Sequence, residues 1–228
     1  MLGLLARRKD TLDALARTLG VPCATYGADV GDVPAVQAGA EDFMARHGVP
    51  DVVIANAGVS AGTSGGEAED LAVLERILRT NVVGLAASLQ PFVAPMRARG
   101  AGILAGIASV AGFRGLPGAG AYSSSKAAAI AWLESLRVEL TGSGVAVVTL
   151  CPGYIDTPMT RVNRYPMPFI LSVDEGARRM ARAIDARCAW AVVPWQMAIV
   201  GWLMRRMPNW LYDRALKRAP RKPRKLPL

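Results

Sequence analysis

Ile103-Leu-Ala-Gly-Ile-Ala108 and Val145-Ala-Val-Val-Thr-Leu150 are apolar runs of strand length, and between them a helical pattern extends from Ala121 to Leu140. Nearly unbroken apolar runs of this kind are typical of strands that are buried on both faces of a sheet. A strand, a helix and a second strand in this order form the unit from which parallel sheets are built. Residues 103–150 therefore predict an α/β fold.

The same alternation continues on the N-terminal side of this unit. Apolar runs of strand length alternate there with helical patterns, in the order Leu2–Ala6, Lys9–Leu19, Val21–Tyr26, Val33–Arg46, Val52–Ala55 and Ala68–Arg99. This order predicts a doubly wound, Rossmann-like parallel sheet with helices on both faces. We assign residues 1–193 to this domain and residues 194–228 to a C-terminal extension, an amphipathic helix followed by a basic tail.

The composition fits one folded domain inside the cell. The chain has 228 residues, of which 52% are hydrophobic and 20% are charged, so it is long enough to bury a sizeable core. Its three cysteines, Cys23, Cys151 and Cys188, form no C-x-x-C pair and indicate neither a disulfide framework nor a zinc site. The N-terminus lacks the charge order and long apolar region of a secretory signal. We expect a cytoplasmic protein.

The net charge of +9 is concentrated at the C-terminus. From Arg205 to Leu228 there are nine basic residues and one acidic residue, Asp213, so this segment carries +8 and the rest of the chain only +1. A high charge confined to a tail does not indicate a nucleic-acid-binding surface on the domain. We therefore expect no nucleic-acid partner.

Polar residues and small turn residues follow the apolar runs. They lie at the carboxyl ends of the expected strands, where open α/β sheets bind their ligands. In chain order they are Arg7 and Arg8, Asp29, Asn56-Ala57-Gly58, Ser109, and Pro152-Gly153. Since the strands are expected to be parallel, these residues should lie along one edge of the sheet.

An ordered set of motifs resembles the short-chain dehydrogenase/reductase family over about Leu2 to Val193. The motifs are Asp29-Val30, Ala55-Asn56-Ala57-Gly58, Asn81, Ser109, Tyr122-Ser-Ser-Ser-Lys126 and Pro152-Gly153-Tyr-Ile-Asp-Thr157. Tyr-x-x-x-Lys alone is a weak signal, whereas the full set in this order is specific. The resemblance implies hydride transfer between a nicotinamide cofactor and a carbonyl or alcohol, on a small-molecule substrate that we expect to be apolar or lipid-like.

The catalytic residues that the resemblance implies are Asn81, Ser109, Tyr122 and Lys126. A free tyrosine has a pKa of about 10, and a nearby ammonium group favours its ionised form. Because residues four apart share a helix face, we expect Lys126 to lie beneath the Tyr122 hydroxyl and to lower its pKa, with Tyr122 as general acid or base. Ser109 would hydrogen-bond the substrate oxygen, and Asn81 would anchor a water that links Lys126 to solvent.

The cofactor that the sequence favours is NADP(H) rather than NAD(H). An arginine directly after the strand Leu2–Ala6 suits the 2′-phosphate of NADP, and the sequence there reads Ala6-Arg7-Arg8. The alternative is a solvated pair of arginines at the start of a helix. The full expected set is Arg7, Arg8, Asp29, Val30, Asn56, Ala57, Gly58, Tyr122, Lys126, Pro152, Gly153, Ile155 and Thr157.

One expected part of the cofactor site is missing from the sequence. No stretch reads Thr-Gly-x-x-x-Gly-x-Gly, the turn between the family's first strand and the helix that binds the phosphates. The chain corresponds to a family member without its first β-α unit, about 25 to 30 residues. We expect a misassigned start within a normal gene. The alternative is a shortened, catalytically inactive homologue that acts as a binding or scaffold protein.

The C-terminal extension has a second pattern. Large apolar residues recur there at roughly helical spacing and precede the basic tail: Trp195, Ile199, Trp202, Leu203, Met207, Trp210 and Leu211. The pattern is too short to span a bilayer. We expect a lid over the substrate pocket or a dimer interface in a homo-oligomer that also pairs through its long central helices. The alternative is peripheral contact with an anionic membrane through the basic residues.

Overall fold

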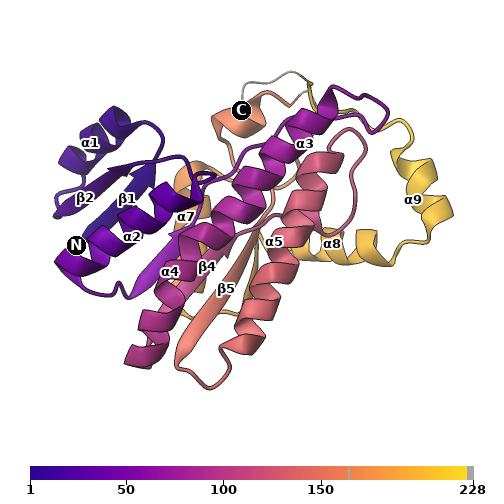
Figure 1. Ribbon diagram of the computed structural model, residues 1–228. Coiled ribbons are helices and arrows are strands. Elements are labelled where there is room, and N and C mark those ends of the chain that lie inside the picture. Colours follow the sequence, from indigo (N-terminus) through magenta and orange to yellow (C-terminus); the bar gives the residue numbers. More distant parts are fainter. Residues whose placement is uncertain (164, 225–228) are drawn as a thin grey trace.

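The computed structural model describes residues 1–163 and 165–224 (Figure 1). Strands and helices alternate along most of the chain, as the apolar runs predict. The elements are β1 (Leu2–Ala6), α1 (Lys9–Thr18), β2 (Cys23–Gly27), α2 (Val33–His47), β3 (Val52–Ala55), α3 (Asp70–Leu78), the π-helical segment η1 (Arg79–Val83), α4 (Gly84–Arg99), β4 (Gly102–Ile107), the 3₁₀ turn η2 (Val110–Gly112), α5 (Gly120–Glu139), β5 (Val145–Pro152), α6 (Pro158–Arg161), α7 (Val173–Asp185), β6 (Trp190–Val193), α8 (Gln196–Arg206) and α9 (Asn209–Leu216).

The strand pairs are parallel, which confirms the predicted fold class. β3, β4, β5 and β6 form a four-stranded sheet in that order, with Leu104 opposite Val147 in the β4–β5 register. β6 and α7 were not predicted. β6 is a four-residue run that begins at the exposed Trp190, so its strand pattern is weak. α7 does carry a signal that was missed, since Ser172 caps it and Val173, Ala177, Met180 and Ile184 follow at helical spacing.

Alternate residues of the central strands face two separate layers of helices. Leu104 and Val147 point into a core formed with α4 and α5, which lie side by side on one face of the sheet (Figure 1). Ile103 and Val148 point to the other face and pack against Ile184 of α7. This two-residue period follows from the alternation of side chains along a strand. The central strands are therefore covered on both sides.

The long helical segment Asp70–Arg99 belongs to this core. By length and composition it is apolar enough to cross a membrane. Leu89 and Met96, however, are fully buried against the sheet and α5. A helix that contributes these side chains to a packed core satisfies the same test of hydropathy, so the segment is explained by its place in the fold.

β1 and β2 form a second, separate sheet. Within the described residues β1 has no hydrogen-bonded neighbour other than β2, and a cavity of about 340 Å³ lies between β1 and β3. Val52 and Ile54 of β3 are 39% and 50% exposed, although both are large apolar residues in a strand. The described residues thus leave a strand edge and apolar surface uncovered at this point of the sheet.

The C-terminal extension forms two helices rather than the single helix that we predicted. α8 ends at Arg206 and α9 begins at Asn209, because Pro208 between them has no backbone N–H for a continuous helix. The basic tail that follows extends from Lys217, and its last basic residue, Lys225, lies outside the described residues.

Arg114, in the loop after β4, fastens both C-terminal helices to the domain. Its guanidinium group donates hydrogen bonds to the carbonyl oxygens of Met204 (2.5 Å) and Met207 (2.6 Å) and to Asn209 Oδ1 (2.8 Å). It also stacks on the Tyr212 ring at 3.8 Å from the ring centroid. The carbonyl groups at the end of α8 are thereby satisfied, and the extension is held close to the expected active-site edge.

Candidate active site

A cavity of about 630 Å³ opens at the carboxyl ends of β1 to β5. Its lining contains most of the residues that the sequence singled out: Arg7, Asp29, Val30, Asn56, Ala57, Gly58, Ser109, Tyr122, Lys126, Pro152, Gly153, Ile155 and Thr157. Arg8 and Asn81 are not part of this lining. The strand ends of the two parallel sheets therefore bring together residues that are spread over 150 positions of the sequence, as the strand-end argument predicts.

Tyr122 and Lys126 lie one turn apart near the start of α5. The Lys126 ammonium group is 5.8 Å from the centroid of the Tyr122 ring. It is buried and donates a hydrogen bond to the carbonyl oxygen of Ile107 (2.7 Å), at the end of β4. The expected pair is thus present on one helix face, but Lys126 is held by the backbone of a neighbouring strand.

Our prediction that Lys126 lowers the pKa of Tyr122 is wrong for this structure. Burial raises the pKa of Tyr122 above its usual value, and a side-chain hydrogen bond with Ser109 acts in the opposite direction. Burial also lowers the pKa of Lys126, to about 8. Loss of hydration disfavours both charged forms, and the carbonyl of Ile107 engages the ammonium group in place of the phenol.

Ser109 stands directly after β4 and is buried. Its hydroxyl donates a hydrogen bond to the carbonyl oxygen of Pro152 (3.3 Å) and accepts one from the N–H of Ala111 (3.1 Å), at the start of η2. These contacts fix the hydroxyl beside Tyr122, and both side chains line the cavity. Together they form a pair of hydroxyl groups that can bind one oxygen atom.

Asn81 is fully buried in the π-helical segment η1, and it connects two elements of the site. Its Oδ1 accepts a hydrogen bond from the N–H of Val59 (2.8 Å), while its Nδ2 donates to the Val59 carbonyl (3.0 Å) and to Ser125 Oγ (2.9 Å). π-Helical turns often mark functional sites. Asn81 thus ties the loop after β3 to α5. The water link to Lys126 implied by the resemblance remains a prediction.

The two arginines after β1 have different positions. Arg7 lines the cavity and forms an ion pair with Asp29 (Nη1 to Oδ2, 3.9 Å), and both side chains are about half exposed. Asp29 Oδ1 also accepts a hydrogen bond from the N–H of Gly31 (2.8 Å). Arg8 is exposed at the position before α1 and makes no side-chain cap. Only Arg7 is thus in a place to contact a molecule in the cavity.

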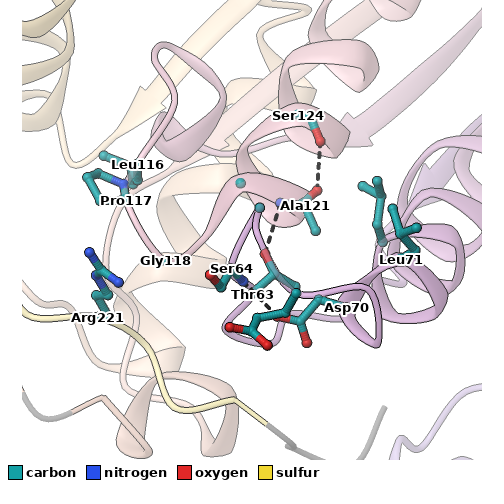
Figure 2. A pocket seen from close by; sticks show the side chains of 14 residues that line it. Thr63, Ser64, Asp70, Leu71, Leu116, Pro117, Gly118, Ala121, Ser124 and Arg221 are labelled. Atoms are coloured by element: carbon teal, nitrogen blue, oxygen red, sulfur yellow. Dashed lines mark hydrogen bonds between the residues drawn. The ribbon is translucent and has the colours of Figure 1, made fainter.

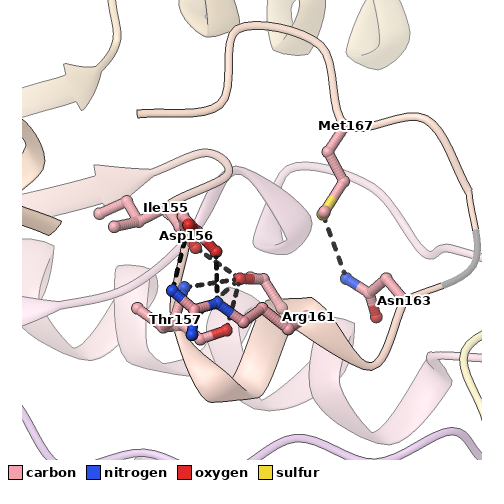
Figure 3. A network of polar contacts seen from close by, with 7 residues as sticks. Ile155, Asp156, Thr157, Arg161, Asn163 and Met167 are labelled. Carbon is pink, nitrogen blue, oxygen red and sulfur yellow. Dashed lines mark hydrogen bonds and ion pairs between the residues drawn. The ribbon is translucent and has the colours of Figure 1, made fainter. Parts of the chain in front are cut away.

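The segment after β5 contributes Ile155 and residues 157–160 to the cavity lining and carries a network of polar contacts (Figure 3). The Thr157 N–H donates to Thr160 Oγ1 (3.0 Å), and Arg161 donates to both carboxylate oxygens of Asp156 (2.7 and 3.2 Å). Arg161 lowers the pKa of Asp156 through this contact. These bonds set the short helix α6 directly after Ile155 and place Met159, which the sequence reasoning missed, in the cavity lining.

A second cavity, of about 490 Å³, lies beside the first turn of α5 (Figure 2). Thr63, Ser64 and Asp70 line one part of it, and Leu116 to Gly118 and Arg221 line another. The N–H of Ala121, next to Tyr122, donates to Thr63 Oγ1 (3.3 Å). The position of Arg221, from the basic tail, was not predicted, because no local sequence pattern relates it to a loop about a hundred residues away.

The cavity suits one half of a nicotinamide dinucleotide better than the other half. A Cβ atom at Gly58 would lie 3.4 Å from Asn81 Oδ1 and 3.5 Å from Lys126 Nζ. Polar groups and accessible backbone therefore lie together at the end of the cavity near Gly58. Such a surface fits a ribose with its hydroxyl groups. The sequence has no glycine-rich turn to supply the backbone N–H groups that cradle a pyrophosphate. The residues present thus fit the nicotinamide riboside half.

Comparison with known proteins agrees with this arrangement. The family model for short chain dehydrogenases matches residues 2–167. An oxidoreductase of Myxococcus xanthus is 37% identical over 215 residues, which are 93% of this chain and 85% of the relative. A match to the probable oxidoreductase EphD of Mycobacterium tuberculosis covers a smaller share, 27% of that protein.

Solved structures share the fold. A short chain dehydrogenase from Burkholderia cenocepacia, determined in complex with NADP, superposes with a TM-score of 0.79 at 24% identity and covers 93% of this chain and 84% of that one. A short chain dehydrogenase/reductase from Burkholderia phymatum, in complex with NAD, gives a TM-score of 0.78 at 24% identity, covering 98% and 88%. From the family match, the relative and the geometry of its site, this chain belongs to the short-chain dehydrogenase family of oxidoreductases.

Proposed function

We propose that this protein transfers a hydride between NADP(H) and a carbonyl or alcohol substrate, with Tyr122 exchanging the proton on the substrate oxygen. The observation that carries the proposal is the pairing of the Tyr122 and Ser109 hydroxyl groups in the cavity at the strand ends. If the Ser109 hydroxyl turns from the Pro152 carbonyl to the substrate, it and the Tyr122 hydroxyl both donate to one oxygen and stabilise the negative charge that develops there when a carbonyl is reduced.

The raised pKa of Tyr122 keeps the phenol in the protonated form, which can donate to a substrate oxygen. Because burial raises this pKa above the usual value for tyrosine, the phenol keeps its proton at neutral pH. A protonated phenol can donate to a carbonyl oxygen as that oxygen gains charge, whereas it accepts a proton from an alcohol less readily. Ser109 would donate to the substrate oxygen in place of the Pro152 carbonyl, while the hydrogen bond from the Ala111 N–H keeps the hydroxyl in position.

A bound nicotinamide would supply the hydride. We assign the contacts of its riboside half to Tyr122 and Lys126 on one side and to Asn56, Ala57 and Gly58 on the other, because these groups line the same end of the cavity. Arg7 supports a preference for NADP. Its guanidinium group lies at the far edge near Asp29, where it could accept a phosphate as a stronger partner than a carboxylate at 3.9 Å.

The test is turnover with a variant that removes only the phenolic hydroxyl. Wild-type protein should oxidise NADPH in the presence of an apolar aldehyde. Tyr122→Phe should still bind NADPH, because it loses one of several cofactor contacts, but should turn over at least a hundredfold more slowly. Tyr26→Phe is the matched control, since the Tyr26 hydroxyl donates to Asp42 and Tyr26 is not part of the lining of this cavity. Equal turnover by Tyr122→Phe and wild type would contradict the role given to Tyr122.

The separation of the two sheets supports a second candidate function, a binding or scaffold role without catalysis. Val52 and Ile54 beside the cavity between β1 and β3 leave apolar surface open, and an incomplete sheet would hold a cofactor weakly. Calorimetry of NADPH binding to the 228-residue chain and to a chain extended upstream to the next in-frame start distinguishes the two candidates. Stoichiometric binding by either chain favours the enzyme, whereas lack of binding by both favours the scaffold.

The exposed apolar face of α8 and α9 supports the proposal of a homo-oligomer. Its large side chains are 38% to 70% exposed: Trp195, Ile199, Trp202, Leu203, Trp210 and Leu211. Contiguous apolar surface of this kind commonly marks an interface. Sedimentation velocity should show a dimer or larger species, and Trp202→Ser with Trp210→Ser should shift it toward the monomer. Co-sedimentation with anionic vesicles would instead favour the membrane alternative.

A further inference from the structure

The end of the described chain, residues 221–224, forms a strap that returns to the active-site edge. The N–H of Gly62 donates a hydrogen bond to the Pro223 carbonyl (3.0 Å), and Arg224 forms ion pairs with Glu69 (2.7 Å) and Asp70 (3.0 Å). A side chain at position 62 would meet the Lys222 carbonyl at 2.1 Å, so only glycine permits this approach. The strap is therefore packed against the loop that follows β3.

Arg221 extends the same contact to the loop before α5. A Cβ atom at Gly118 would lie 2.7 Å from the Arg221 Cβ atom, and Figure 2 shows Arg221 beside the segment from Leu116 to Gly118. The strap thus passes from one loop at the active-site edge to another. Acidic residues of this chain already neutralise one of its cations, Arg224, which removes that charge from any role in binding a membrane.

Lys222 occupies the centre of the strap. Its ammonium group donates hydrogen bonds to Ser60 Oγ (2.9 Å) and to the Met159 carbonyl (3.4 Å). Met159 lines the active-site cavity, and Ser60 follows Val59, which also lines it. The ammonium group therefore bridges the loop after β3 and the segment after β5 at the edge of the cavity.

The charge of Lys222 has no acidic counterpart in the described part of the chain. Other cations at this edge do: Arg161 pairs with Asp156 and Arg7 with Asp29. Both atoms that Lys222 contacts are neutral oxygens, and partial burial lowers its pKa to about 8. A partly buried cation with only neutral partners gains most from an anion that approaches it, because charge-assisted hydrogen bonds are stronger than neutral ones.

We propose that Lys222, with the Ser60 hydroxyl, binds an anionic oxygen group of the substrate, a carboxylate or a phosphate, at the edge of the active-site cavity. This inference rests on the proposed function, since it assigns a substrate class to the same site. The carbonyl or alcohol would lie at Tyr122 and Ser109, and the anionic end would lie at the strap. The substrate is then an acid with an apolar body rather than a neutral lipid.

Direct binding tests the inference without turnover. Calorimetry would compare para-toluate and para-tolyl phosphate with the neutral para-toluamide, on wild type, Lys222→Met, Lys222→Arg and the control Lys217→Met, which removes an exposed cation of the same segment. We expect at least one anion to bind wild type more tightly than the amide, with about tenfold or greater loss in Lys222→Met, recovery in Lys222→Arg and no change in Lys217→Met. Which anion binds more tightly identifies the group. Equal binding by Lys222→Met and wild type, or no preference for either anion, overturns the inference.

Turnover separates this inference from the proposed function. The kcat/KM for para-formylbenzoate relative to its methyl ester should fall about tenfold or more in Lys222→Met and stay unchanged in Lys217→Met. If neither aldehyde oxidises NADPH with wild type, the proposed function fails, while the binding comparison still decides the role of Lys222. If both aldehydes are reduced with the same relative rates in all variants, the enzyme reading stands and the substrate class is wrong.

Discussion

Replacing Asn81 with alanine removes the connection between the loop after β3 and α5. Asn81 is fully buried and makes three hydrogen bonds, one with the Val59 N–H, one with the Val59 carbonyl and one with Ser125 Oγ. Ser125 keeps a partner in Asn81→Ala, because its hydroxyl also donates to the Tyr122 carbonyl (2.7 Å). The Val59 N–H loses the acceptor that the structure gives it.

The expected cost is about 3 kcal/mol of unfolding free energy. Loss of the partners of the partly buried Val59 N–H and carbonyl costs roughly 1–3 kcal/mol, and the space left by the truncated side chain adds to this. Such a loss is a large part of the roughly 5–15 kcal/mol that stabilises a typical domain. With a urea m-value of about 1–3 kcal/mol/M, the unfolding midpoint should fall by roughly 1–3 M at constant m.

Equilibrium urea unfolding, followed by the fluorescence of the five tryptophans, measures this loss. Asn56→Ala is the matched control, since Asn56 is exposed and should change stability by less than about 0.5 kcal/mol. Hydrogen exchange adds a local signature, because the Val59 amide should lose protection in Asn81→Ala. A loss below about 1 kcal/mol, or an equal loss in Asn56→Ala, would refute the reasoning.

Three further outcomes follow from the same contacts. Gly201→Ala should cost about 1–3 kcal/mol in unfolding free energy, because a Cβ at this position of α8 would lie 2.1 Å from the Phe113 ring. Gly65→Ala has open space around it and should be neutral, and thermal unfolding compares the two variants. Binding of para-toluate should weaken as the pH rises through about 8, since Lys222 then loses its proton while the carboxylate stays ionised. Calorimetry at several pH values measures this, and an affinity that does not change with pH would show that Lys222 is not involved. Reduction of an aldehyde by wild type should not show loss of the Tyr122 proton below about pH 10, because burial raises the pKa of that phenol; a fall in kcat near neutrality that Tyr122→Phe abolishes would contradict this.

The candidate catalytic set was accessible from the sequence because its members are fixed by local rules. Tyr122 and Lys126 share a face of α5 since they are four residues apart, and Ser109 lies at a strand end since it follows an apolar run. The family resemblance then supplied roles for these positions. Element boundaries that depend on strong apolar patterns, such as β1 and β3, coincide with the predicted ranges.

Features that depend on partners distant in the sequence were not accessible in this way. The sequence predicted that the Lys126 ammonium group lies beneath the Tyr122 hydroxyl. In the structure this group donates a hydrogen bond to the Ile107 carbonyl, and burial raises the pKa of Tyr122. It indicated a basic tail free to contact a membrane, but Arg224 pairs with Asp70.

The sequence by itself determined the parallel α/β fold and the identity of the Ser109, Tyr122 and Lys126 set, because periodicity and strand ends are properties of neighbouring residues. Only the tertiary structure decided which groups surround that set, including the contact of Lys222 with Ser60 across 162 positions of the chain. Burial and hydrogen-bond partners determine pKa and charge balance, and both arise from packing between segments that no local pattern relates.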